Sequence, residues 1–162
     1  MKRVGFLLAV ASVLFIASAG VLRAQGRFGF GFIVGDPTGF SFKYKMNNEN
    51  AIDGALGFFP SNRFRLHADY LWVARPFRDQ QFTLTYGVGP AVGFGRTEIV
   101  ARKGLIYYSR QEAAFGIRFP LGVSYMIPRS PVELTLELAP LVVFAPDGGF
   151  GIDGGLAIRL YP

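Results

Sequence analysis

The sequence of 162 residues contains no cysteine and only one histidine. The absence of cysteine excludes a disulfide-stabilised scaffold, a cysteine-ligated zinc site, a cysteine nucleophile and a lipid-anchored N-terminus. Charged residues are also scarce, at 17% of the chain, where soluble proteins average about 25%. Apolar residues make up 51%, which is too many for a disordered chain. The length indicates a single domain.

The N-terminus has the pattern of a secretory signal peptide. Lys2 and Arg3 precede an uncharged, mostly apolar run over residues 4–17, and small residues follow at 18–20. The run is shorter than the roughly 20 residues of a membrane-spanning helix, although an N-terminal anchor is the alternative. We therefore expect the protein to be exported.

This interpretation divides the chain into a signal peptide, residues 1–24, and a domain, residues 25–162. Cleavage is predicted after Ala19 or Ala24. Losing the signal peptide lowers the formal net charge from +6 to +3 or +4. The remaining cations are scattered, without a basic stripe or a recognition helix, so no nucleic-acid partner is expected.

From Arg27 onward, large apolar residues alternate with small or polar ones at the period of two that is typical of β-strands. Ten strands would crowd the polar stretch near Tyr107, whereas eight leave room for connections and place both chain ends on one side. We predict an all-β, eight-stranded antiparallel up-and-down transmembrane β-barrel. The alternating segments are 28–32, 40–44, 52–58, 64–72, 82–94, 115–125, 132–138 and 150–160.

Volume decides which face is expected inside. An eight-stranded barrel has an interior that side chains just fill, so its many Phe and Leu residues could not all fit there. This argues against a lipocalin-like barrel with an apolar interior, and a soluble β-sandwich would not explain the placement of the aromatic residues. The predicted outer girdles are Phe40, Phe58, Phe64, Phe94, Phe115, Phe144 and Phe150 at one rim and Tyr44, Trp72, Phe82 and Tyr125 at the other.

The opposite face carries small residues and charges of both signs, which are predicted to pair in the lumen because unpaired buried charges are costly. Arg159 is expected to lie between Glu133 and Glu137, with Arg118 approaching Glu137. Lys43 and Lys45 are expected opposite Gly31 and Gly29. The predicted network is Lys43, Lys45, Asp53, Arg63, Arg65, His67, Asp69, Arg118, Glu133, Glu137, Asp153 and Arg159.

Two stretches carry a family resemblance. Residues 28–43 contain a Gly-Asp-Pro-Thr-Gly turn followed by Phe-Ser-Phe-Lys, and residues 51–57 read Ala-Ile-Asp-Gly-Ala-Leu-Gly. Together they resemble a family of small outer-membrane barrels of spirochaetes and other two-membrane bacteria. More broadly, the chain is similar to the eight-stranded barrels of the OmpA and OmpX type. Its end, residues 155–161, resembles the strand signal of the barrel-insertion machinery, but has Leu160 at the usual aromatic place and a final Pro162.

Catalytic and ligand motifs are weak. His67 and Asp69 share a face and could serve a serine such as Ser124, but their predicted inward orientation removes them from lipid. The glycines of 149–154 match a dinucleotide motif without the βαβ unit that it requires. We predict no enzyme activity, no catalytic residue, no metal site and no cofactor.

The longest predicted outward loop spans residues 96–111. Its Tyr and Arg side chains are of the types that dominate binding interfaces, and the alternative is a strand extension above the membrane. The candidate binding residues are Arg102, Lys103, Tyr107, Tyr108 and Arg110.

The predicted protein is therefore an outer-membrane barrel with a charge-filled lumen and a structural or surface-binding role. Its expected partners are outer-membrane lipid, the insertion machinery and an extracellular ligand of unknown identity. A narrow channel and, third, a lipid-modifying enzyme are the alternatives.

Overall fold

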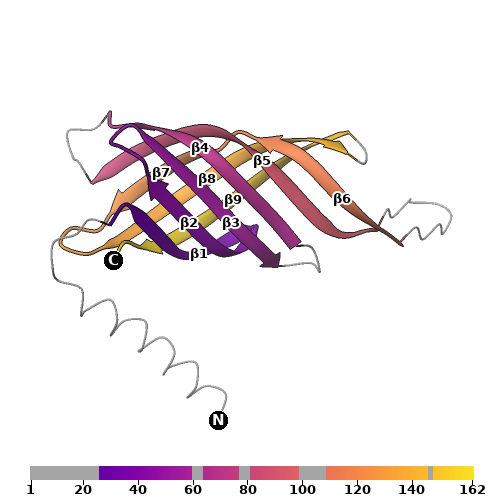
Figure 1. Cartoon of the computed structure of the whole chain (residues 1–162), viewed down its shortest axis with the longest axis horizontal. Helices are drawn as coiled ribbons and strands as arrows, with labels where there is room; N and C mark the ends of the chain where they lie inside the picture. The colour runs from indigo at the N-terminus through magenta and orange to yellow at the C-terminus, as the bar shows by residue number, and fades with distance from the viewer. Residues whose placement is uncertain (1–25, 60–63, 77–80, 99–108, 146–147) are drawn as a thin grey trace, which may run out of the picture.

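The computed structural model describes residues 26–59, 64–76, 81–98, 109–145 and 148–162. The predicted signal peptide lies outside them, and none of them forms a helix that could cross a membrane. The regular structure of this part of the chain consists of strands alone (Figure 1). The strands are β1 (Phe28–Asp36), β2 (Thr38–Lys45), β3 (Asn50–Phe59), β4 (Phe64–Ala74), β5 (Phe82–Glu98), β6 (Ser109–Arg118), β7 (Leu121–Met126), β8 (Val132–Ala145) and β9 (Gly149–Leu160).

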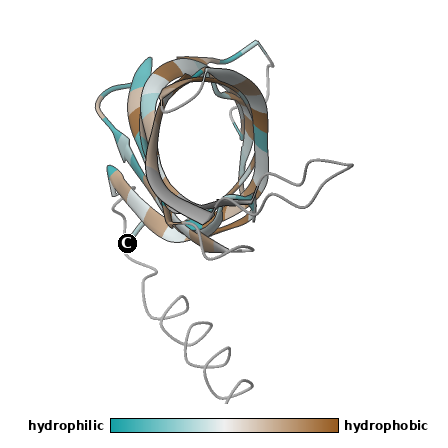
Figure 2. Ribbon diagram, turned by 90° about the vertical axis from the view of Figure 1, so that its right-hand side faces the viewer, coloured by the Kyte–Doolittle hydropathy of each residue, from teal (hydrophilic) through white to brown (hydrophobic). Residues whose placement is uncertain are grey.

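The strands close into a barrel in which each pairs antiparallel with its neighbours. β1 pairs with β9 and β4 pairs with β5, so these strands have a neighbour on both sides. Figure 2 shows the resulting ring. This closure satisfies the backbone donors and acceptors that an open edge would expose.

β6 and β7 are two parts of one strand of this barrel. Both lie between β5 and β8, and the register is the same on either side of the break, with Gly89 opposite Arg118 and Tyr86 opposite Leu121. Pro120 interrupts the strand because proline has no backbone N–H to donate to the ladder. The barrel is therefore eight-stranded and all-antiparallel, as predicted.

The two faces of the barrel are sorted as the alternation predicts. In β8, Leu136 and Leu138 point outward and are 60% and 58% exposed, while Glu133, Thr135 and Glu137 are buried. A buried apolar cluster is limited to small or branched side chains, Ile33, Ala55 and Ala157. The bulk of the apolar side chains therefore cover the outside of the barrel.

Aromatic rings form a continuous outward row near one rim. Centroid separations are 5.2 Å for Phe32–Phe40, 6.1 Å for Phe40–Phe58, 5.6 Å for Phe58–Phe64 and 6.2 Å for Phe64–Phe94. These separations allow favourable offset and edge-to-face contacts. Phe115, Phe144 and Phe150, predicted at the same rim, are also exposed.

A second group of outward rings lies towards the other rim. Trp72 is 5.1 Å from Tyr70 and 5.6 Å from Tyr86, and Phe82 is 4.7 Å from Tyr125, measured between ring centroids. The outer surface thus has aromatic rings towards both rims.

The barrel ends differ. The C-terminus and the β2–β3 and β7–β8 turns lie at one end, named here the turn end, and β5 and β6 extend furthest at the opposite loop end (Figure 1). Residues 96–98 pair with 109–111, so both ends of the predicted loop belong to paired strands. Arg102, Lys103, Tyr107 and Tyr108 lie outside the described residues, and only the backbone of Arg110 is described.

One predicted register was wrong. Lys43 lies opposite Gly29, Ser41 lies opposite Gly31, and the backbone N–H of Lys45 donates to Arg27. The hairpin is tighter than expected, because β2 begins one residue after Pro37.

Candidate functional site

The barrel interior holds the predicted charged residues, and it is the candidate functional site. Arg63 lies outside the described residues. Glu137 and Arg118 are buried, whereas Arg65 and Lys45 are partly exposed near opposite ends. The inward-facing predicted residues are Lys43, Lys45, Asp53, Arg65, His67, Asp69, Arg118, Glu133, Glu137, Asp153 and Arg159.

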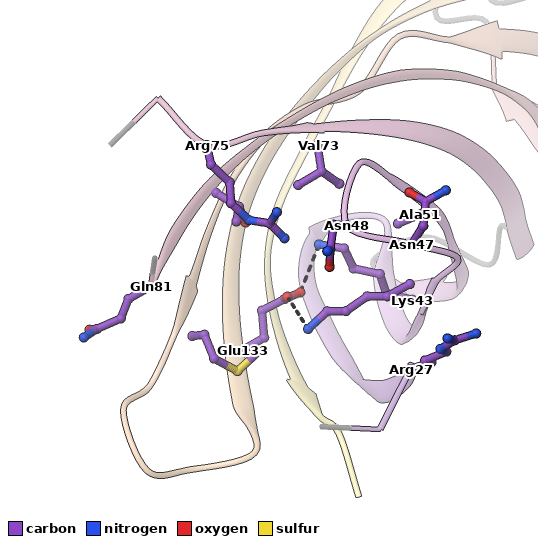
Figure 3. A pocket seen from close by; sticks show the side chains of 12 residues that line it. Arg27, Lys43, Asn47, Asn48, Ala51, Val73, Arg75, Gln81 and Glu133 are labelled. Atoms are coloured by element: carbon purple, nitrogen blue, oxygen red, sulfur yellow. Dashed lines mark hydrogen bonds and ion pairs between the residues drawn. The ribbon is translucent and has the colours of Figure 1, made fainter. Parts of the chain in front are cut away.

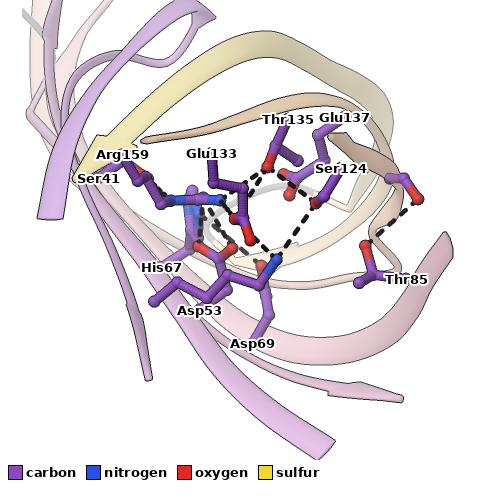
Figure 4. Close-up of polar contacts among 12 residues, drawn as sticks. Ser41, Asp53, His67, Asp69, Thr85, Ser124, Glu133, Thr135, Glu137 and Arg159 are labelled. Atoms are coloured by element: carbon purple, nitrogen blue, oxygen red, sulfur yellow. Dashed lines mark hydrogen bonds and ion pairs between the residues drawn. The ribbon is translucent and has the colours of Figure 1, made fainter. Parts of the chain in front are cut away.

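Arg159 is the centre of one group of charges, in the half of the lumen nearer the turn end. It is 1% exposed, and its NH2 lies 2.7 Å from Asp53 Oδ2, while its NH1 lies 3.4 Å from Glu133 Oε1. Its Nε donates to Ser41 Oγ at 2.8 Å. The guanidinium thus joins β2, β3, β8 and β9 across the lumen, and Figure 4 shows these side chains converging. We name Lys43, Lys45, Asp53, Glu133 and Arg159 the Arg159 cluster.

Glu133 accepts further partners. Lys43 Nζ lies 3.1 Å and Lys45 Nζ lies 3.9 Å from its carboxylate. The hydroxyl of Tyr161, which follows the last strand, donates to Glu133 Oε1 at 3.3 Å. Burial, reinforced by the charge of Glu133, raises the pKa of Tyr161, so its hydroxyl keeps its proton.

Arg118 is the centre of a second group of charges, which extends towards the loop end. Its NH2 donates to Glu137 Oε1, and its NH1 lies 3.3 Å from Asp69 Oδ2 without hydrogen-bond geometry. Its Nε lies 4.0 Å from Asp153 Oδ2. We name Arg65, His67, Asp69, Arg118, Glu137 and Asp153 the Arg118 cluster.

Arg65 connects this cluster to the loop end. Its NH2 lies 2.9 Å from Asp153 Oδ1, and its NH1 donates to Asp36 Oδ1 at 2.6 Å. Asp36 is the last residue of β1, so the two ion pairs of Arg65 join the end of β1 to β4 and β9. The Arg159 cluster and the Arg118 cluster each contain positive and negative side chains, so both signs of charge occur along the lumen.

The predicted pairing of Arg159 was partly wrong. Arg159 is the direct cross-strand partner of Glu133, whereas Glu137 lies opposite Gly155. The register between β8 and β9 therefore differs by two residues from the predicted one. The other pairing, between Arg118 and Glu137, is confirmed.

Several uncharged partners were not predicted. Ser124 Oγ and Thr135 Oγ1 are hydrogen-bonded at 2.9 Å, and Lys43 Nζ donates to Ser124 at 3.3 Å. The inward position of Tyr161 could have been found, because it continues the odd-numbered inward series of β9. These groups matter because each gives a buried charge a hydrogen-bond partner.

One group has ligand types suited to a cation. The ligand atoms of His67, Asp69 and Glu137 lie within 4.8 Å of one another, a grouping that the sequence spacing did not predict. Arg118 already contacts both carboxylates and supplies positive charge there. The arrangement is accounted for as a buried ion-pair network.

The hypothetical catalytic set is not assembled. His67 Nε2 lies 3.8 Å from Asp69 Oδ2, but the hydroxyl of Ser124 is hydrogen-bonded with Thr135 and Lys43. Within the described residues no contact joins Ser124 to His67.

Comparison with known proteins identifies the family of this chain. A family model described as a protein of unknown function, DUF3996, matches residues 21–146. The chain belongs to the DUF3996 family. No curated protein and no solved structure matches it. The family match covers eight of the nine labelled strands, β1 to β8, and therefore most of the lumen residues described above.

Proposed function

We propose that this member of the DUF3996 family is an outer-membrane β-barrel with a sealed, charge-filled lumen. The observation that carries the proposal is the sorting of side chains: large apolar groups face outward around the barrel and charges are buried inside. Hydrocarbon is the solvent that suits such an outer surface, because a closed barrel leaves no backbone group unpaired in lipid. Aromatic rings towards both rims suit the two interfaces.

The remaining features support the same location. The N-terminal pattern of residues 1–24 is that of an export signal. The resemblance to small outer-membrane barrels, of spirochaetes and of the OmpA and OmpX type, rests on residues 28–43 and 51–57. In this proposal the partners are outer-membrane lipid and the barrel-insertion machinery.

The proposed role is structural or surface-binding. The β5–β6 hairpin extends beyond the barrel at the loop end, where it would meet the exterior. The residues proposed to bind there are those predicted from the sequence, Arg102, Lys103, Tyr107, Tyr108 and Arg110.

The side chains that cross the lumen support the proposal that it is sealed. Arg159 contacts residues of β2, β3 and β8, and Arg118 contacts residues of β4, β8 and β9. A permeating ion would have to separate these buried ion pairs, and separating one pair costs roughly several kcal/mol. A narrow channel is therefore the second candidate and catalysis on lipid the third.

Planar-bilayer recording of the purified barrel tests this function. The folded protein is first shown to partition into phospholipid vesicles and to resist protease there. We expect no steady conductance steps, with an open porin recorded in parallel as the positive control. Steady steps of one size would overturn the sealed lumen, and a protein that stays soluble without detergent would overturn the membrane location.

A further inference from the structure

The turn end of the barrel contains a cavity of about 600 Å³. We name it the turn-end cavity. Its charged lining consists of Arg27, Lys43, Lys45, Arg75 and Glu133, and the rest is mostly small or amide-bearing. This volume lies within the range of small-molecule sites, about 300–1,000 Å³.

The lining carries an excess of positive charge. The lining has four cations and a single carboxylate, that of Glu133. This carboxylate already forms ion pairs with Lys43, Lys45 and Arg159. Among the residues that the structure describes, neither Arg27 nor Arg75 has an acidic partner. Within the described part of the chain, these two cations of the lining are therefore not neutralised by a carboxylate.

Three of the four cations lie close together. In Figure 3, Arg75 extends toward the pair formed by Lys43 and Glu133, whereas the side chain of Arg27 lies apart from them. Lys45 Nζ lies 3.8 Å from the centre of the Tyr161 ring and within electrostatic reach of Lys43 and Arg75. Like charges gathered in a concave site repel one another, and an anion placed between them relieves that repulsion.

We propose that the turn-end cavity binds a small, multiply charged oxyanion that presents phosphate or carboxylate groups. Arg75 offers a planar guanidinium group that matches such oxygens in two-bond geometry, Lys45 adds a point charge, and Arg27 adds positive charge elsewhere in the lining. The site depends on the barrel's own geometry and does not rest on the proposed membrane location. It lies at the end opposite the β5–β6 extension, so it is separate from the proposed surface-binding residues.

Calorimetric titration of the folded protein in neutral detergent with pyrophosphate, and separately with citrate, tests the site. Arg75→Gln is expected to weaken binding by about tenfold, the usual size of one lost charge-assisted bond. Adding Arg27→Gln should weaken it further. Both side chains are exposed and without ion pairs in the described chain, so the barrel is expected to fold normally, as circular dichroism would verify.

Arg129→Gln is the matched control. Arg129 lies in the β7–β8 turn at the same end, is exposed, and does not line the cavity. Its replacement removes the same charge and is expected to leave binding unchanged. Equal weakening by Arg129→Gln and Arg75→Gln would show net charge at work, and it would overturn the site.

The source of the oxyanion is tested separately. Binding of the wild type and of Arg75→Gln is compared on nanodiscs of phosphatidylcholine with and without phosphatidic acid, whose phosphate monoester can carry two negative charges. Binding that depends on Arg75 and appears with phosphatidic acid but not with free pyrophosphate or citrate assigns the cavity to a lipid headgroup, and the reverse assigns it to a soluble anion. If no probe binds in an Arg75-dependent way, the proposal is wrong, whatever the conductance result.

Discussion

The charged residues of the lumen are stabilised by one another, since they are removed from water. Arg159 is almost fully buried and contacts two carboxylates from different strands. Removing one partner of such a group leaves the others uncompensated, which costs more than the pair contributes. Replacing one member of an ion pair should therefore lower the free energy of unfolding more than replacing both members together.

The substitution Arg159→Met is expected to lower the free energy of unfolding by about 3–5 kcal/mol, because Asp53 and Glu133 lose their shared cation. Urea titration of the barrel in detergent measures this. Adding Asp53→Asn to the variant should recover part of the loss. A change below about 1 kcal/mol, comparable to an isolated surface pair, would contradict the network.

Tyr161 connects stability to alkaline pH. Its pKa is raised by burial and by Glu133 above the ordinary value of 10.0, so the folded state holds the proton more tightly than the unfolded chain. The resulting stabilisation is complete below pH 10 and is lost as the pH rises beyond it. Tyr161→Phe should be less stable than the wild type at pH 8, with a difference that narrows above pH 10 in unfolding titrations. A difference independent of pH would count against the buried hydroxyl.

At the scale of the strands, glycine allows the closest approaches. A Cβ on Gly89 would lie 2.2 Å from the carbonyl oxygen of Ala68 and 2.3 Å from Asp69 Oδ1. In contrast, a Cβ on Gly149, at the start of β9, would meet nothing within 4 Å. The two positions form a matched pair.

Gly89→Ala is expected to destabilise the barrel by about 1–3 kcal/mol, the usual cost of overpacking a buried site. Gly149→Ala should leave stability nearly unchanged. Unfolding midpoints of the two variants in the same detergent measure the contrast. Equal midpoints would mean that β4 and β5 are not as close as the structure has them.

The period-two alternation was sufficient to predict the eight strands and the faces taken by the described residues of the alternating segments. It could not predict register, because an alternation of period two is unchanged when the pairing shifts by two residues. The β1–β2 register, at the tight turn of Pro37, and the β8–β9 register both differ from the predicted ones by two positions. For the same reason the grouping of His67 with Glu137 could not be predicted, because these residues are 70 positions apart in the sequence and meet only across the lumen.

At the scale of the whole molecule, the outward-facing side chains determine whether the barrel is more stable in lipid or in water. Leu136 lies in the outward face of β8 and is 60% exposed. Leu136→Arg should lower the free energy of unfolding in phospholipid vesicles by about 2–4 kcal/mol, as for a charge facing lipid near the middle of a bilayer. An unchanged folding free energy would indicate that this face meets water.

The central claim is that the apolar face lies in hydrocarbon, and the chain's single tryptophan reports on it directly. Trp72 points outward near the turn end, beside Tyr70 and Tyr86. In vesicles of lipids brominated along their acyl chains, we expect strong quenching of Trp72 fluorescence, strongest for bromine near the headgroup. Equal fluorescence in brominated and unbrominated vesicles would contradict the claim.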